Sequence, residues 1–278
     1  MLPDPSGKAS RDESELVAGF EFTPWRFAVD ADYQARKLAC CGIDPAIWGD
    51  CLDPSNFALL TIRHVNRDGF SINGSVHMIQ RYRQFAPVKI GEEIELRGRV
   101  TGIEPAPRGT LMHAGFEVVR ADGSVAMELA RTSVRMSQDG ERKGPAAGAK
   151  PAAENPDAPA MGLPVIGEKQ LTPDGVGNFS DDRMNRIHDD PEVARQFGFR
   201  APIAAGIMGS HILMEALVKD GGGPPRELDM EVRFRRPMFW DELLTLHGEH
   251  AAGHLSRIAL MKPEGKPACF GLVERVVY

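Results

Sequence analysis

The sequence predicts an α+β protein built from two tandem halves, each with a central helix wrapped by an antiparallel sheet. Three observations predict it: a central segment that cannot form a core, two flanking segments that resemble each other, and the order of helix and strands within each flanking segment. The chain has 278 residues, which is long enough for two cores of ordinary domain size.

Residues 137–162 are predicted to be a linker. From Ser137 to Ala160 the chain is rich in Pro, Ala, Gly and charged residues and, proline aside, has no apolar side chain larger than alanine. Such a segment lacks the side chains needed to bury a face. The linker separates an N-terminal half, residues 15–136, from a C-terminal half, residues 163–278.

The two halves repeat a pattern without a gap. Residues 83–96 read RQFAPVKIGEEIEL and residues 233–246 read RFRRPMFWDELLTL, which indicates a strand, a proline corner, an acidic turn and a second strand in both. Each half then ends in a predicted hairpin, with Gly123 and Gly265 at the turns.

Apolar segments of helical length, residues 53–64 and 203–218, precede these strands. Each half is therefore expected to be one helix followed by about four antiparallel strands.

Composition and charge argue against several classes of partner. The chain has 33 Lys and Arg against 39 Asp and Glu, a formal net charge of -6, so it lacks the positive charge on which sequence-independent nucleic-acid binding depends. No apolar stretch approaches the roughly 20 residues of a spanning helix, and the first residues lack a secretory pattern. We therefore expect a cytoplasmic protein that binds neither nucleic acid nor membranes.

The four cysteines, Cys40, Cys41, Cys51 and Cys269, show no metal-finger spacing and are expected to be reduced, buried thiols.

A short helix is predicted just after His188. Asp190 is suited to be its N-cap, Pro191 its first residue, and Gly198 the residue just past its end. His188 is therefore expected in a loop that leads into a helix start.

The longer helix that follows Pro202 begins with the small residues Ala204, Ala205 and Gly206. Small residues let another group approach the backbone closely. The first N–H groups of a helix lack intrahelical partners and lie at the positive end of its dipole, which suits an oxygen that gains negative charge during a reaction. Gly206 is the residue expected to donate its N–H to such an oxygen.

The segment from Asn185 to Gly206 carries a spaced set of residues: Asn185, Ile187, His188, Asp190, Ala194, Gly198, Phe199, Pro202, Ile203 and Gly206. This set resembles the hydratase motif of the MaoC-like and (R)-specific enoyl-CoA hydratase family. The resemblance covers the C-terminal half well and the N-terminal half in outline, and it implies a double hot dog fold and a homodimer. It implies a degenerate N-terminal half that holds the acyl chain, a catalytic C-terminal half, and no cofactor, with CoA present only as part of the substrate.

The resemblance implies reversible hydration of a 2-enoyl thioester, carried by CoA or acyl carrier protein, to a 3-hydroxyacyl thioester. The family's catalytic pair is an Asp followed five residues later by a His. The His falls on His188, whereas the Asp position is Arg183, which can neither accept a proton nor orient water as a carboxylate does. Three possibilities stay open: Asp182 takes the role, His188 acts while Asn185 holds the water, or the chain binds thioesters without hydrating them.

Residues near the motif are candidates for substrate contact. Arg183, Ile203 and Ala205 are expected near the thioester. Arg235 and Arg236 are expected to meet the phosphates of CoA, although a solvent-exposed strand edge would explain them equally well.

Four further histidines are expected to be bystanders. His77 is expected to be structural, and His247, His250 and His254 are expected to be surface residues without metal geometry.

Laying Thr23-Pro24 on Thr172-Pro173 puts His188 opposite Ala39 and Asn185 opposite Arg36, so one complete site per chain is expected. Two other functions stay open. Thioester hydrolysis would need a carboxylate near the helix start, where residues 204–206 supply none. A non-catalytic acyl-thioester binding protein is the third possibility.

Overall fold

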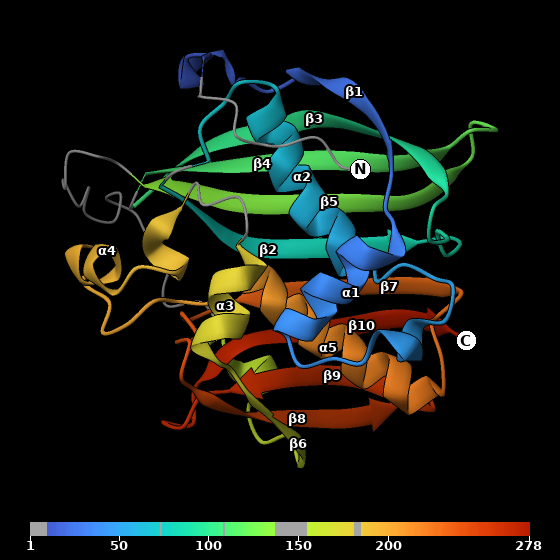
Figure 1. Cartoon of the computed structure of the whole chain (residues 1–278), viewed down its shortest axis with the longest axis vertical. Coiled ribbons are helices and arrows are strands. Elements are labelled where there is room, and N and C mark those ends of the chain that lie inside the picture. The colour runs from blue at the N-terminus through green and yellow to red at the C-terminus, as the bar shows by residue number, and fades with distance from the viewer. Residues whose placement is uncertain (1–9, 73, 108, 137–154, 181–184) are drawn as a thin grey trace.

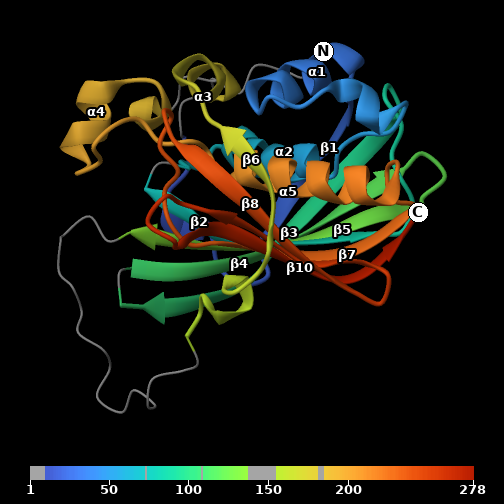
Figure 2. The same cartoon turned by 90° about the horizontal axis from the view of Figure 1, so that it is seen from below.

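The computed structural model of the chain describes residues 10–72, 74–107, 109–136, 155–180 and 185–278. Ten antiparallel strands form one sheet in the order β1-β3-β4-β5-β2-β7-β10-β9-β8-β6, and the longer helices lie on one face of it (Figures 1 and 2). None of the described helices is long and apolar enough to cross a membrane.

The first half contributes five neighbouring strands and two α-helices. Its elements are a 3-10 turn at Glu13–Glu15, β1 at Glu21–Ala28, α1 at Ala31–Cys40, a 3-10 turn at Pro45–Trp48, α2 at Ser55–Arg67, β2 at Ser75–Gln84, β3 at Glu93–Ala106, β4 at Gly109–Arg120 and β5 at Val125–Met136.

The second half contributes the other five strands. Its elements are a 3-10 turn at Ala158–Ala160, β6 at Val165–Gln170, α3 at Pro173–Phe179, a 3-10 turn at Arg186–His188, α4 at Pro191–Gln196, α5 at Gly206–Gly221, β7 at Glu227–Phe234, β8 at Leu243–Ala251, β9 at His254–Met261 and β10 at Pro267–Val277.

The central helices and the four strands after each of them agree with the sequence prediction. Four elements were not predicted: the first strand of each half, β1 and β6, and the helices α1 and α3. Strands β1 and β6 are the two edges of the sheet. The side chains of β6 are exposed or only partly buried, so this strand lacks the apolar alternation by which a half-buried strand is predicted.

The end of the predicted linker is packed rather than free. Asp157 accepts hydrogen bonds from Arg235 at 2.7 Å and from Arg236 at 2.6 Å, and Ala160 lies in a small apolar cluster with residues of β9 and β10. Side chains elsewhere in the fold thus order a segment that has little to bury by itself. Residues 137–154 lie outside the described residues.

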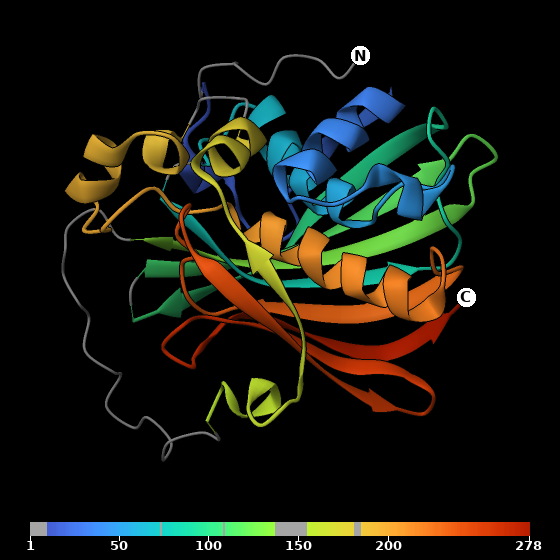
Figure 3. The ribbon, with the colours of Figure 1, turned by 60° about the horizontal axis from the view of Figure 1, so that its bottom comes forward.

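The starts of the two central helices are built alike. The N–H of Leu52 donates to the carbonyl of Val88 at 2.9 Å, and the N–H of Ala204 donates to the carbonyl of Met238 at 2.8 Å. Isolated β-bridges join the preceding residues, Cys51 to Lys89 and Ile203 to Phe239. Each helix therefore begins where the chain is tied to the proline corner of its own half. Figure 3 shows α5 lying along the strands of the second half.

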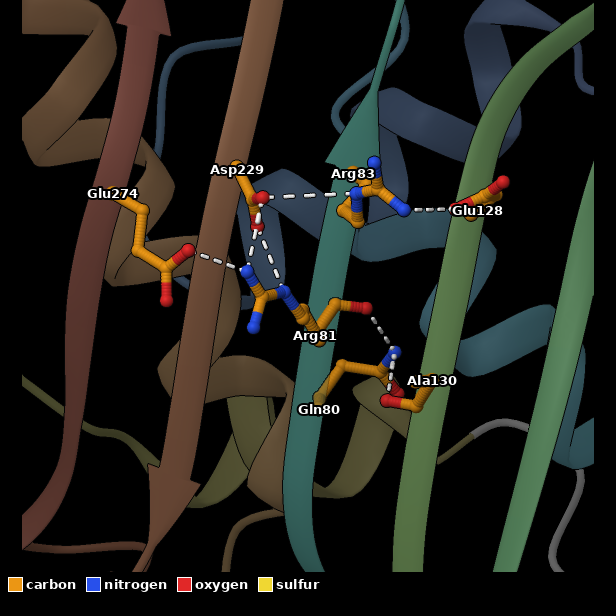
Figure 4. A network of polar contacts seen from close by, with 7 residues as sticks. All are labelled: Gln80, Arg81, Arg83, Glu128, Ala130, Asp229 and Glu274. Atoms are coloured by element: carbon orange, nitrogen blue, oxygen red, sulfur yellow. Dashed lines mark hydrogen bonds and ion pairs between the residues drawn. The ribbon is translucent and has the colours of Figure 1, made fainter. Parts of the chain in front are cut away.

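The halves meet where β2 pairs with β7, over residues 79–84 and 228–233. On the outer face of this seam, Arg81 binds Asp229 at 2.9 Å and Glu274 at 2.5 Å, and Arg83 binds Glu128 at 2.6 Å (Figure 4). One hydrophobic core includes residues of both halves. Pairing, ion pairs and a shared core thus connect the halves into a single sheet structure.

Candidate active site

His188 ends a single 3-10 turn, Arg186–His188, rather than lying in an irregular loop. Asn185 is the N-cap of this turn, and its Oδ1 accepts a hydrogen bond from the N–H of Ile187 at 3.3 Å. The contacts described for Asn185 thus give it a structural task at the turn, and the prediction that it holds water or His188 stays a prediction.

The helix after His188 begins and ends as the sequence predicts. Asp190 caps α4 by accepting from the N–H groups of Glu192 at 2.9 Å and Val193 at 3.3 Å, and Gly198 has a φ of 80° just past its end. Arg186 also binds Asp190 at 3.0 Å. The cap and this ion pair attach the His188 turn firmly to α4.

The imidazole of His188 is half-buried and held by a backbone carbonyl. Its Nδ1 lies 2.7 Å from the carbonyl oxygen of Ile203, and the N–H of Ile203 donates to the carbonyl of Ile187 at 3.2 Å. A carbonyl can only accept, so Nδ1 carries the proton. In the neutral ring the lone pair is therefore on Nε2.

The start of α5 offers backbone donors without a side-chain cap. Its N-cap, Ala205, has no side-chain oxygen, and no side-chain hydrogen bond caps the helix. Ile203, Ala205 and Gly206 are partly exposed whereas Ala204 is buried. A Cβ added to Gly206 would lie 3.2 Å from the ring of Phe234, so glycine lets the helix start close against β7.

The structure therefore brings His188 against Ile203, three residues before α5 begins at Gly206. Asp182 and Arg183 lie outside the described residues. Arg235 and Arg236 contact Asp157, so phosphate would have to compete with an existing carboxylate. Their binding to CoA remains untested.

Two residues of the first half, His77 on β2 and Arg131 on β5, lie beyond Phe234. The sequence predicted a functional role for neither of them. The ring of His77, on β2, lies 4.7 Å from that of Phe234, centroid to centroid. Burial, and secondarily the charge of Arg131 on β5, lower the pKa of His77 to about 3. The available signal for Arg131 was an arginine in line with the apolar residues Met127 and Leu129, on the same face of a predicted strand.

A buried polar pair joins the two central helices. His211 on α5 lies with its Nδ1 2.6 Å from Oδ2 of Asp53, just before α2, and both side chains are fully buried. The other oxygen of Asp53 accepts from the N–H of Ser55 at 2.8 Å. Both carboxylate oxygens are therefore occupied inside the protein.

Two hollows are described on the surface, and both lie away from His188. One, of about 670 Å³, lies near the start of α2 and is lined by residues including Trp48, Cys51, Phe85 and Lys89. The other, of about 380 Å³, is lined by residues including His113 and Thr132. Among the described residues, no group of three or more His, Cys, Asp or Glu side chains could hold a metal ion.

No protein-family model matches the chain, and no curated protein matches it. Solved structures do. HtdX of Mycobacterium tuberculosis matches with a TM-score of 0.73 and 20% identity, over 90% of this chain and 98% of its own. A MaoC-like dehydratase from Phytophthora capsici matches with a TM-score of 0.70 and 16% identity, over 95% and 98%.

A Mycobacterium tuberculosis protein described as having a double hot dog fold matches with a TM-score of 0.56 and 14% identity, over 94% of this chain and 97% of its own. The chain has a double hot dog fold. The predicted fold class and the resemblance to MaoC-like proteins are thereby confirmed. An acyl-ACP thioesterase from Bacteroides thetaiotaomicron also matches, with a TM-score of 0.56 and 12% identity, over 91% and 96%. The double hot dog alone thus does not choose between hydration and hydrolysis.

Proposed function

We propose that the chain is a hydro-lyase that reversibly hydrates a 2-enoyl thioester of CoA or acyl carrier protein. The observation that carries the proposal is the 2.7 Å hydrogen bond from His188 Nδ1 to the carbonyl of Ile203. It fixes the tautomer of a base and ties that base to the segment that begins α5. A base beside a helix start is the arrangement that addition of water to a polarised double bond requires.

In the proposed reaction, Nε2 of His188 takes a proton from water as the water oxygen bonds to C3. The electrons of the C2–C3 double bond move toward the thioester, whose carbonyl oxygen gains negative charge. The N–H of Gly206 stabilises that oxygen, and return of the proton from His188 to C2 completes the addition. The reverse sequence removes water from the 3-hydroxyacyl thioester.

The structure favours this reaction over hydrolysis of the thioester. The start of α5 has Ala204, Ala205 and Gly206 and supplies no carboxylate. The start of α2 has one, Asp53, but its oxygens are bound to His211 and to the N–H of Ser55. A carboxylate held in this way is poorly placed to attack a substrate or activate water.

The test is hydration of crotonyl-CoA, followed by the fall in enoyl-thioester absorbance. We expect His188→Ala to slow hydration about 10²- to 10⁴-fold, the usual worth of general acid–base assistance. The matched control is His247→Ala, since His247 Nδ1 also lies 2.7 Å from a carbonyl, that of Leu163. Equal rates for His188→Ala and the parent would refute the assignment.

A thiol reagent, added to the same reactions, distinguishes the other functions. If the parent protein releases free CoA and forms no 3-hydroxyacyl thioester, it is a thioesterase. Binding of the CoA ester with neither change would indicate a binding protein.

A further inference from the structure

An arginine occupies an inward position of β5, among residues that form the core. Arg131 is 5% exposed, and its neighbours on the same face, Leu129 and Ser133, are 2% and 3% exposed. Ala130 and Thr132, which alternate with it, are exposed or only partly buried. Side chains alternate along a strand, so the side chain of Arg131 lies on the face of the sheet that α2 and α5 cover.

Within the described part of the chain, no carboxylate lies within ion-pair distance of Arg131, and its Nε is enclosed without a hydrogen-bond partner. Arg135 follows on the same strand and face and binds Glu13 at 3.0 Å. Burial, and secondarily the charge of Arg135, lower the pKa of Arg131 to about 10, so it is still a cation at neutral pH. An unpaired buried cation is unfavourable, and such exceptions are expected at functional sites.

Arg131 lies next to the wall of the candidate active site. Gly206 packs against Phe234, and the ring of Phe234 contacts that of His77. The charge of Arg131 reaches His77, whose two ring nitrogens are buried. The backbone of Ile79 and the side chain of Gln80 lie close enough to this ring to oppose the lowering of its pKa, although neither makes a hydrogen bond of regular geometry with it. A neutral imidazole has one N–H donor. From Gly206 toward the first half, the site thus continues into a polar patch that contains a guanidinium and a neutral imidazole.

We propose that Arg131 binds a carboxylate at the far end of the acyl group, so that the preferred substrates are 2-enoyl thioesters of dicarboxylic acids. The inference rests on the proposed function, which places the thioester carbonyl at Gly206. The guanidinium presents paired N–H donors that match a carboxylate, and the N–H of His77 supplies a further hydrogen bond. The ligand itself completes the ion pair that Arg131 lacks.

The test compares acyl groups that differ only in the terminal group. For chains of four, six and eight carbons, kcat/KM is measured for the trans-2-enoyl-CoA and for its analogue with a terminal carboxylate. We expect the carboxylate to raise kcat/KM about 10- to 100-fold at its preferred length, the range of a hydrogen bond to a charged group. Arg131→Met and Arg131→Gln are expected to abolish the preference, so that the two members of each pair have the same kcat/KM in these variants.

Arg135→Met is the matched control, because it removes an arginine from the same face of the same strand and should keep the preference. No preference at any length in the parent overturns the inference and leaves hydration standing. The inference is also overturned if Arg131→Met and Arg131→Gln lower kcat/KM equally for the uncharged and the carboxylated substrate. That result would mean that the cation contacts CoA or only supports the fold.

A binding experiment separates failure of this inference from failure of the proposed function. Hexanoyl-CoA and adipyl-CoA lack the double bond and cannot be hydrated, so calorimetry reports binding alone. We expect the parent to bind adipyl-CoA about 10-fold more tightly than hexanoyl-CoA. Arg131→Met should bind the two esters equally. That result supports the carboxylate site even in a protein that hydrates nothing, whereas equal binding of both esters to the parent overturns it.

Discussion

Burial disfavours the charged form of both His77 and Arg131, with different results at neutral pH. The pKa of His77 falls to about 3 and that of Arg131 to about 10. The imidazole is therefore neutral while the guanidinium remains charged. Two adjacent bases thus supply a neutral hydrogen-bond donor and a fixed positive charge, and this difference remains over the whole physiological range of pH.

The lowered pKa of His77 makes the fold sensitive to acid. Between about pH 6.5 and pH 3, the unfolded chain binds a proton at this position and the folded chain does not, so stability falls as the pH falls through that window. We expect His77→Phe, which keeps an aromatic ring against Phe234, to reduce the slope by up to about 1.4 kcal/mol per pH unit. Urea unfolding at pH 6.5 and 4.5 measures it.

Some acid sensitivity should remain in that variant, because burial also lowers the pKa of His64. The prediction fails if the parent and His77→Phe lose the same free energy of unfolding between the two pH values.

Local signals predicted the residues around His188, whereas Arg131 and His77 could not be interpreted from them. The cap of Asp190 and the positive φ of Gly198 depend on residues within one turn, which a sequence displays directly. The role of Arg131 depends on the face that it occupies and on the missing carboxylate opposite it. Both depend on residues that are distant in the sequence and are brought near Arg131 only by the fold.

At the scale of elements, a buried polar contact joins α5 to the start of α2, between His211 and Asp53. His211 and Asp53 are both fully buried, so neither can replace this hydrogen bond with one to water. The two helices can shift past each other only by separating this pair. The contact therefore fixes where each helix starts relative to the other.

Removing one partner should cost more than removing both. We expect His211→Leu to lower the free energy of unfolding by about 3 kcal/mol or more, because it strands the carboxylate of Asp53 in the core. Adding Asp53→Asn to that variant removes the charge and should restore part of the loss. Urea unfolding of the parent, both single variants and the double variant measures the coupling. A double variant less stable than His211→Leu would contradict the prediction.

The central helices were predictable because each is long and apolar, although both begin two or three residues later than predicted, at Ser55 and Gly206. Edge strands gave no comparable signal. Strand β1 carries Pro24 at a register shift against β3, and β6 pairs on one side only, with β8. Their strand state comes from a neighbouring strand, not from their own residues.

At the scale of the whole molecule, the seam between β2 and β7 makes the halves one structure. Its backbone pairing continues the sheet, and the Arg81–Asp229 ion pair crosses it at 2.9 Å. The hydrophobic core also spans both halves. A half without the other would expose both a strand edge and apolar core surface.

We therefore expect both halves to unfold together. The three tryptophans report on this, since Trp25 and Trp48 lie in the first half and Trp240 in the second. One variant keeps Trp240 alone (Trp25→Phe, Trp48→Phe) and another lacks only Trp240 (Trp240→Phe). In each, the fluorescence midpoint in urea should coincide with the midpoint by far-ultraviolet circular dichroism. Separated midpoints within one variant would show that the halves unfold independently.

The matched tethering of Leu52 and Ala204 places Asp53 and Ala205 at corresponding points of the two helix starts. In a homodimer of identical subunits, every mutation occurs in both subunits. A carboxylate that blocks one helix start would therefore block the equivalent helix start of the other subunit as well. When the two halves are joined in one chain, each can be mutated separately. One copy is free to become scaffold and the other to keep its chemistry, and the two can thereafter diverge without either repeating the other's mutations.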